Sequence, residues 1–389
     1  MQEFSTVKAE EPPRAIPGGG SRRGRLLALA CAGVAAVTLL ASDGVLRGAA
    51  LVGAGMQFPE GAGALLAAAR GPAAPEDETG LVDAPAAAAQ PKKSAAEKDK
   101  SFDIAATPAD VLALAEAEEA ALSSLEQKKA GEIRAKTYVA GDGTQYLGNV
   151  SIRNTTATRK VDITAELQKK MPLKIDKSKP AVLIYHTHTT EAYELLDRDW
   201  YPEGWEERSE NGGRNVVRVG DAIMQMLERA GYQVIHDTTI YDRQYGGAYD
   251  RSRATVQRIL KENPSIQITL DVHRDAIHTD GGVHIRPSAE IDGKRAAQIM
   301  IITGTEEGGI TGYPNWAQNL TFAVQLQKCA EDACPGLMRP LFFCPRKYNM
   351  NETPYSLLLE VGADGNTLEE AVYSGRMIGA ALAGWMDGH

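Results

Sequence analysis

The chain has 389 residues, of which 43% are hydrophobic and 24% charged, so it is long enough and apolar enough to bury a core. Its formal net charge is −9 at pH 7, whereas a domain that binds nucleic acid normally carries a basic surface. We therefore expect a globular protein of one large domain or two ordinary ones with flanking segments, and no nucleic-acid partner.

The N-terminal segment indicates membrane insertion or export. Three arginines at positions 22–25 precede an apolar run over residues 26–41, and basic residues before an apolar stretch keep the N-terminus in the cytoplasm. We predict a cytoplasmic segment over residues 1–25 and a transmembrane anchor or signal segment over residues 26–45, with the rest of the chain outside the cytoplasm. The run is short for a bilayer span, which needs roughly 17–25 residues, so a cleaved signal peptide competes with a single-pass anchor in the cell membrane.

Two further segments precede the main domain. Residues 46–108 are rich in Ala, Pro, Glu and Lys, which predicts a flexible spacer because little burial is available to offset the entropy of ordering. Residues 109–135 are rich in Ala, Leu and Glu, with leucines at helical intervals, which predicts a helix. The domain itself is expected over residues 136–389.

From about Thr137 onward, short apolar runs alternate with amphipathic segments. Such alternation predicts an α/β fold whose sheet has helices on both faces. Strands are predicted over Ala181–Tyr185, Tyr232–His236, Ile266–Val272, Gln298–Thr303 and Ser356–Val361. Helices are predicted over Asn215–Ala230, Arg251–Lys261 and Thr367–Met386. In sheets of this class, the chemistry takes place at the carboxyl ends of the strands.

Polar side chains stand at the ends of three of these strands. His188 and Glu191 follow the first strand, His273 directly follows a later one, and Glu360 lies within the last. If the three strands are neighbours, these groups converge on one edge of the sheet.

The residue types at these positions are those of a catalytic zinc centre. His188 and Glu191 stand three residues apart, so a tight turn places both side chains on one side, and His273 adds a second imidazole. Two nitrogens and one oxygen hold Zn²⁺ tetrahedrally with a fourth position for water, whose pKa the metal lowers to about 7. Glu360 is the candidate for accepting the proton of that water, since a Glu in an apolar strand is costly to bury without a function or a partner.

Other residues compete for the ligand positions. His186 competes with His188 as the first ligand, and Glu210 is a reserve for Glu191 as the third. Each group also has an ordinary structural alternative, in which the histidines bond within the core and the glutamates pair with arginines or face the solvent.

The residues around His273 are secondary candidates. Arg274 is a candidate for binding a substrate carboxylate or stabilising an oxyanion. Asp275 is a candidate for orienting His273, as metal-bound histidines usually require. His278 and His284 flank two glycines in an apparent hairpin beside the site, and we predict that they are loop residues without a catalytic role.

Three cysteines, Cys329, Cys334 and Cys344, cluster late in the chain. In an exported domain, one pair of them is able to form a disulfide. Three unpaired thiols are an equal alternative, and the spacing is not that of a zinc ribbon.

Several long stretches of the domain are similar to one known family, in the same order along the chain. They are VLIYHTHTTEAY (Val182–Tyr193), NVVRVGDA (Asn215–Ala222), LDVHRDA (Leu270–Ala276), NWAQNLTFAVQLQ (Asn315–Gln327), PGLMRPLF (Pro335–Phe342) and YNMNETPYSLLLEVGADGNTLEEA (Tyr348–Ala371). Together they resemble stage II sporulation protein P of endospore-forming bacteria, and the resemblance runs from about Lys136 to the C-terminus.

The resemblance implies an amidase-like α/β fold with a mainly parallel sheet, related to the zinc N-acetylmuramoyl-L-alanine amidases. It implies a zinc-dependent peptidoglycan hydrolase, both amidase and peptide cross-link endopeptidase, that acts in septal thinning and engulfment during sporulation. Stage II sporulation proteins D and M are the implied partners. The histidines of the family match His188 (or His186) and His273, and its catalytic glutamate matches Glu360.

The third ligand is where this chain departs from the amidases. In those enzymes the glutamate ligand lies just before the first long helix, where this chain has Gly213 and Arg214. We therefore favour Glu191 as the third ligand, with Glu210 behind it.

Two other functions stay open. A zinc carboxypeptidase also uses a His-x-x-Glu pair followed by a distant His and Glu, and it requires a positive group for the terminal carboxylate, for which Arg274 is the local candidate. A non-catalytic scaffold that binds the cell wall or partner proteins is the alternative from another class, and it predicts a domain without zinc.

Overall fold

The computed structural model describes residues 102–123, 127–279 and 281–389. All described residues belong to one compact unit of the chain, Gly80–His389. The predicted cytoplasmic segment, the predicted membrane segment and most of the predicted spacer therefore lie outside the described residues. Within the described part, no helix combines the length and the apolar character needed to cross a bilayer.

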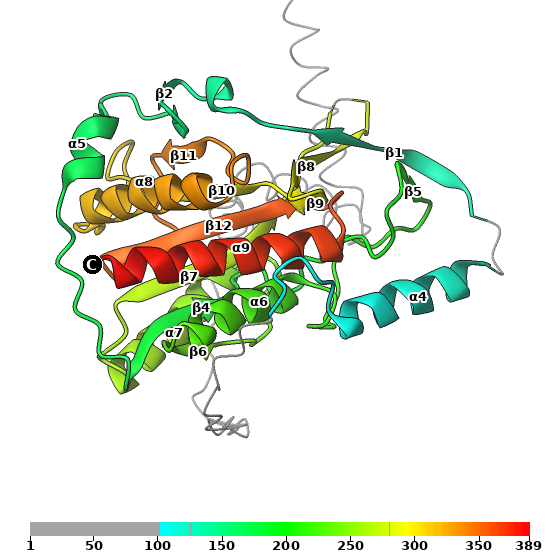
Figure 1. Cartoon of the computed structure of the whole chain (residues 1–389), viewed down its shortest axis with the longest axis horizontal. Helices are drawn as coiled ribbons and strands as arrows, with labels where there is room; N and C mark the ends of the chain where they lie inside the picture. The colour runs from blue at the N-terminus through cyan, green and yellow to red at the C-terminus, as the bar shows by residue number, and fades with distance from the viewer. Residues whose placement is uncertain (1–101, 124–126, 280) are drawn as a thin grey trace, which may run out of the picture. The chain divides into compact units, whose positions relative to one another are not determined.

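The described residues contain a mixed sheet of eight strands in the order β2-β3-β11-β10-β12-β7-β4-β6 (Figure 1). These are β2 (Gln145–Leu147), β3 (Val150–Asn154), β4 (Pro180–Tyr185), β6 (Gln233–His236), β7 (Ile268–Asp275), β10 (Ile299–Gly304), β11 (Leu341–Cys344) and β12 (Tyr355–Ala363). Strands β12, β7, β4 and β6 run parallel, as do β3, β11 and β10, whereas β10 is antiparallel to β12 and β2 to β3. The predicted α/β class is confirmed. The sheet as a whole is mixed, so the mainly parallel arrangement that the resemblance implies holds only within the set β12, β7, β4 and β6 and within the set β3, β11 and β10.

Helices cover both faces of this sheet, as the alternation predicted. Helices α6 (Val216–Arg229), α8 (Trp316–Ala333) and α9 (Leu368–Asp387) pack on one face, where Figure 1 shows α8 and α9 side by side, and α7 (Ala248–Glu262) packs on the other. Successive side chains of a strand point to opposite faces. In β4, accordingly, Val182 and Ile184 belong to the main core with α6, α8 and α9, whereas Leu183 and Tyr185 pack with α7.

Side-chain caps begin the two long helices next to the site. At the start of α9, the Thr367 hydroxyl accepts a hydrogen bond from the Glu370 N–H, and the Glu370 carboxylate accepts one from the Thr367 N–H. At the start of α6, the Asn215 side chain accepts from the Val217 N–H. Caps of this kind satisfy N–H groups that have no partner within the helix, which explains why both helices begin where the sequence predicted.

A smaller sheet of four strands is also present within the described residues, in the order β5-β1-β8-β9. These strands are β1 (Lys129–Lys136), β5 (Trp200–Pro202), β8 (His284–Ile291) and β9 (Lys294–Ala297). The helix predicted over residues 109–135 is therefore wrong in its second half, because α4 (Ala109–Ser123) is followed by β1. The helical spacing of leucines ends at Leu125, Gly131 disfavours a helix, and pairing with both β5 and β8 supplies the backbone hydrogen bonds of a strand.

The last residues of the predicted spacer pack against the domain. The Arg376 guanidinium donates to the carbonyl groups of Ile104 and Ala106, and Ile104 packs against the main core. Together with β1, these contacts place the start of the folded unit ahead of the predicted boundary at residue 136. These contacts use both backbone carbonyls and the apolar side chains of Ile104 and Ala105.

The register of β4, β7 and β12 positions the polar strand ends. Tyr185 at the end of β4 pairs with Asp271 of β7, and His273 of β7 pairs with Glu360 of β12. Because the three strands are parallel neighbours, the segments that leave β4 and β7 emerge at the same edge, beside Glu360.

Two glycines of α9 test how closely α9 and α6 pack. A Cβ at Gly379 would lie 2.8 Å from the Ile223 carbonyl oxygen of α6, whereas a Cβ at Gly384 would meet nothing within 4 Å. Gly384→Ala should stabilise the protein by up to about 1 kcal/mol through helix propensity, and Gly379→Ala should destabilise it by about 1–3 kcal/mol through overpacking. Urea unfolding measures both, and equal effects of the two substitutions would show that the helices are not in close contact.

Candidate metal centre

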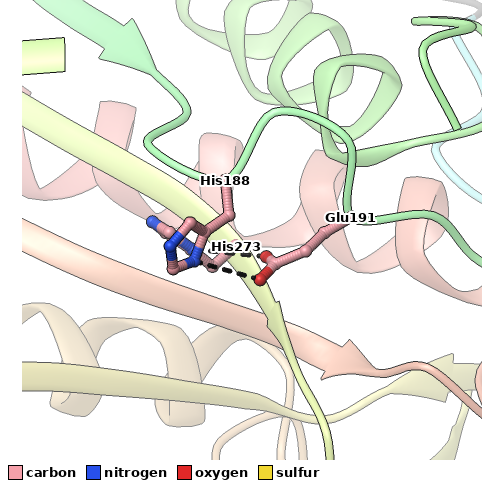
Figure 2. Close-up of side chains that lie close together, drawn as sticks. All are labelled: His188, Glu191 and His273. Atoms are coloured by element: carbon pink, nitrogen blue, oxygen red, sulfur yellow. Dashed lines mark ion pairs between the residues drawn. The ribbon is translucent and has the colours of Figure 1, made fainter. Parts of the chain in front are cut away.

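Three ligand-type side chains meet at this edge of the sheet. Ligand atoms of His188, Glu191 and His273 all lie within 4.8 Å of one another. The His188 Nδ1 is 3.3 Å from Glu191 Oε1, and the His273 Nδ1 is 3.2 Å from Glu191 Oε2. Figure 2 shows the two imidazoles and the carboxylate pointing toward one another, from the loop after β4 and from β7. The residues are 8%, 7% and 2% exposed, so the structure brings the three sequence-selected ligands together in a buried position.

A tight turn after β4 places His188 beside Glu191. The Glu191 N–H donates to the His188 carbonyl at 3.1 Å, which puts the two side chains on the same side. Thr187 anchors the turn, since its N–H and its hydroxyl both donate to the Asp271 carboxylate. Thr190 bonds a second aspartate in the same way. The threonines around His188 thus supply the hydrogen bonds that fix the turn.

Asp271 lies behind His273. The His273 Nε2 is 2.8 Å from Asp271 Oδ1, although the two are not in line for a hydrogen bond. A carboxylate in this position orients a ligand histidine and raises its basicity. Asp275 is the candidate for this role in the sequence, but its carboxylate pairs with Arg339 at 2.9 Å. Both aspartates share a strand face with His273; Asp275 is the last residue of β7, where Arg339 reaches it.

Glu360 lies opposite His273 in the neighbouring strand, β12. Its Oε2 is buried and has no hydrogen-bond partner among the described residues. Burial raises the pKa of Glu360 to about 8, and the Asp275 carboxylate adds to the rise. A buried carboxyl with no partner and a pKa near neutrality is suited to taking up and releasing a proton.

Mutual contact sets the charges within the cluster. Burial alone would raise the pKa of Glu191, but the imidazoles of His273 and His188 outweigh it and hold that pKa well below its ordinary value. Burial alone would lower the pKa of His273, but the carboxylates of Asp271 and Glu191 outweigh it and hold that pKa well above. The Glu191 carboxylate and the His188 and His273 rings therefore favour a positive charge between them. Two imidazole nitrogens and a carboxylate oxygen are also a zinc donor set, so the residues fit this metal.

The reserve ligand His186 lies outside the cluster. Both of its ring nitrogens are engaged, Nδ1 at 2.8 Å from the Val272 carbonyl and Nε2 at 2.8 Å from His236 Nε2. Alternation along an extended segment would point His186 and His188 the same way, but the strand ends at Tyr185 and the turn that follows separates the two rings.

Glu210 and Arg274 are engaged elsewhere. Glu210 is exposed and accepts two hydrogen bonds of 2.9 Å from Arg243. The Arg274 guanidinium donates to the carbonyl groups of Ala192 and Glu207 at 2.8 and 2.6 Å, which holds the loop after β4 against β7. These contacts make Arg274 a positioning residue, and they do not support its predicted role in binding a substrate carboxylate or an oxyanion.

Two tyrosines that sequence analysis did not select contact His188. Tyr245 stacks on its ring with centroids 4.7 Å apart, and Tyr249 meets it edge-on at 5.5 Å. Both come from the stretch YGGAYD at the start of α7, where two aromatic residues flanking glycines were the available signal. Asp271 was missed as well, although a charged residue in the apolar run IQITLDV is the same signal that pointed to Glu360.

The three cysteines among the described residues are free thiols. Cys344 is buried in β11, where burial raises its pKa to about 12. Cys329 and Cys334 are partly exposed. Of the two alternatives that the sequence left open, the structure therefore has the three unpaired thiols.

Comparison with known proteins identifies a family. The family model for stage II sporulation protein P matches residues 81–383. The stage II sporulation protein P of Bacillus subtilis (strain 168) is 32% identical over an alignment of 216 residues, and the match covers 52% of this chain and 50% of that protein. The match thus spans about half the length of this curated relative.

Solved structures of amidases are similar at a lower level. The N-acetylmuramyl-L-alanine amidase Ami1 from Mycobacterium smegmatis is 11% identical with a TM-score of 0.33, and the match covers 54% of this chain and 99% of that one. The CwlD amidase from Clostridioides difficile, solved in complex with the GerS lipoprotein, is 12% identical with a TM-score of 0.32, over 53% of this chain and 97% of that one. TM-scores of this size do not establish a shared fold.

The unpaired carboxyl of Glu360 predicts how stability depends on pH. The folded chain keeps this proton up to about pH 8, whereas the unfolded chain loses it near the ordinary value of 4.5. Ionisation therefore penalises the folded state, and stability falls as the pH rises through this window. In metal-stripped protein, Glu360→Gln should gain stability relative to wild type between about pH 5 and pH 8, by at most about 4 kcal/mol.

Thermal unfolding at several pH values measures this gain. Glu210→Gln is the matched control. Arg243 lowers the pKa of Glu210, so replacing Glu210 should give no gain in stability between about pH 5 and pH 8. A pH-independent difference between Glu360→Gln and wild type would show that Glu360 is already ionised in the folded chain.

Proposed function

Because the chain belongs to the stage II sporulation protein P family, we propose that it is a zinc-dependent peptidoglycan hydrolase that acts during sporulation. The proposed activities are those of an N-acetylmuramoyl-L-alanine amidase and of an endopeptidase that cleaves peptide cross-links. One observation carries the proposal: three buried metal-ligand side chains converge beside a carboxyl, that of Glu360, which has an unpaired oxygen.

The metal would be held by His188, Glu191 and His273. Asp271 would keep the His273 ring in place from the far side, and such carboxylates typically strengthen metal binding. When bound, zinc would polarise the substrate carbonyl and make a bound water more acidic.

Glu360 carries the proton in this proposal. It takes a proton from the attacking water and passes it to the leaving amine. Both tasks need a pKa near the working pH, and burial sets the pKa of Glu360 at about 8; a nearby divalent cation shifts such a pKa downward, toward neutrality. Because Oε2 has no competing hydrogen bond, no bond has to break before the proton moves.

Tyr245 and Tyr249 shape the approach to the site. Their rings pack on His188 and restrict its rotation. Burial raises the pKa of both hydroxyls, so both tyrosines stay neutral hydrogen-bond donors at the working pH. Their aromatic faces also exclude water from the ligand histidine.

The competing functions have less support from the site. A carboxypeptidase needs a free cation for the terminal carboxylate of its substrate, whereas Arg274, the cation that sequence analysis selected, is committed to backbone carbonyls. A non-catalytic scaffold gives no reason for the buried, unpaired oxygen of Glu360, because such a group costs stability.

The proposal extends to location and partners. Residues 26–45 would anchor the chain in the membrane or direct its export, with the hydrolase domain outside the cytoplasm at the septal or engulfing membrane. Stage II sporulation proteins D and M are proposed as partners on the basis of family membership.

Digestion of purified sacculi tests the reaction. Glu360→Gln should keep zinc at the wild-type level and lose digestion by a factor of at least about 100, because general acid–base catalysis contributes roughly 10²–10⁴-fold. Glu210→Gln, which changes an exposed glutamate outside the site, should keep both. Free stem peptides among the products identify an amidase, cut cross-links an endopeptidase, and single amino acids a carboxypeptidase. Full digestion by Glu360→Gln would rule out its role as proton carrier.

Zinc affinity distinguishes the two aspartates of β7. Asp271→Asn should weaken zinc binding by about 10–100-fold, because the His273 ring loses the carboxylate behind it. Asp275→Asn, at the position favoured by the sequence, should bind zinc nearly as the wild type does, since its carboxylate pairs with Arg339. Competition against a chelating dye measures both constants, and the reverse order would assign the orienting role to Asp275.

A further inference from the structure

A second group of ligand-type residues lies beside the site. Within the described residues, ligand atoms of His278, His284 and Asp364 also lie within 4.8 Å of one another. His278 and His284 pair across the turn that leads into β8, and Asp364 directly follows β12. Sequence analysis predicted two loop histidines without a role, but the structure places both against a buried carboxylate.

The Asp364 carboxylate faces two imidazoles. The His278 Nε2 lies 2.5 Å and the His284 Nδ1 3.1 Å from the same oxygen, Oδ2. The two rings are stacked, with centroids 3.9 Å apart and an interplanar angle of 26°. Asp364 and His284 are buried, whereas the His278 side chain is 38% exposed. The group therefore has one side open to solvent.

One nitrogen of this group has no hydrogen-bond partner in the part of the chain that the structure describes. The His284 Nδ1 is buried and, despite its short distance to Asp364, is not aligned for a hydrogen bond. Leaving a buried polar atom without a hydrogen bond destabilises the folded chain. Tyr201 and Trp205 nevertheless hold the ring in place, with centroids 4.3 and 5.0 Å away. A nitrogen that is fixed, buried and unpaired is placed as a ligand.

The charges also favour a cation. The Asp364 carboxylate lies within 3.1 Å of a nitrogen of each of the two stacked rings. A metal ion binds imidazole in its neutral form, so it is able to pair with this carboxylate and both rings at once.

We propose that His278, His284 and Asp364 form a second divalent-cation site, for which zinc is the fitting ion. Two imidazole nitrogens and one carboxylate oxygen match the ligand preference of zinc, and the open side at His278 leaves a position for water. The ion fastens the turn between the two histidines to the end of β12.

This site is separate from the first. The two groups share no residue, and Asp364 lies in the turn after β12, not in the strand beside Glu360. A two-metal catalytic centre holds its ions roughly 3.5–4 Å apart. The second ion therefore stabilises the fold beside the site and takes no direct part in the reaction.

Zinc stoichiometry of the full chain tests this proposal. Protein purified without a histidine tag, stripped with a chelator and reloaded with zinc should bind two ions per chain by elemental mass spectrometry. His188→Gln and His284→Gln should each bind one, and the double variant none. His389→Gln is the matched control, because it removes an imidazole that belongs to neither group, and it should still bind two.

His278→Gln provides a second variant in case His284→Gln does not fold, since the His278 side chain is partly at the surface. The proposal is overturned if His284→Gln and His278→Gln bind as many zinc ions per chain as the wild type does. A wild type with a single ion that His188→Gln keeps and His284→Gln loses would support this site and refute the proposed catalytic centre, so the two proposals fail separately.

Discussion

The parallel alignment of β4, β7 and β12 is the constraint on which the site depends. Parallel neighbours end at one edge of a sheet, so side chains far apart in the sequence meet there. His273 pairs with Glu360 across β7 and β12, and a slip of one residue would turn either side chain to the opposite face. The cores on the two faces resist that slip, because Leu183 and Ile184 of β4 already pack on opposite sides.

Two glutamates in this site behave differently because their neighbours differ. Glu191 lies against two imidazoles, which hold its pKa well below the ordinary value and keep it a charged ligand. Glu360 has an unpaired oxygen, and burial raises its pKa to about 8. When their environments push the pKa values of two carboxyl groups apart, one group stays charged and the other is able to transfer a proton. The same contrast explains why Glu210, exposed and paired with an arginine, has no place in the site.

The sequence predicted the central strands and the main candidates, because burial on both faces produces continuous apolar runs such as Ala181–Tyr185, and a polar residue at the end of such a run is conspicuous. The second half of the predicted helix failed, because the pairing of β1 with β5 and β8 is a tertiary contact that overrides local propensity. Asp271 carried a local signal, its charge within an apolar run, but that Asp271 lies against His273 while Asp275 pairs with Arg339 depends on contacts between distant segments. Local patterns do not encode such contacts.

Anomalous X-ray scattering from a zinc-loaded crystal tests the central claim most directly. The account predicts a zinc peak about 2.0–2.2 Å from a nitrogen of His188, a nitrogen of His273 and a carboxylate oxygen of Glu191, with the Glu360 carboxyl facing the ion. Zinc bound by other residues with this cluster left without metal, or a Glu360 carboxyl turned into the core and bonded there, would contradict it.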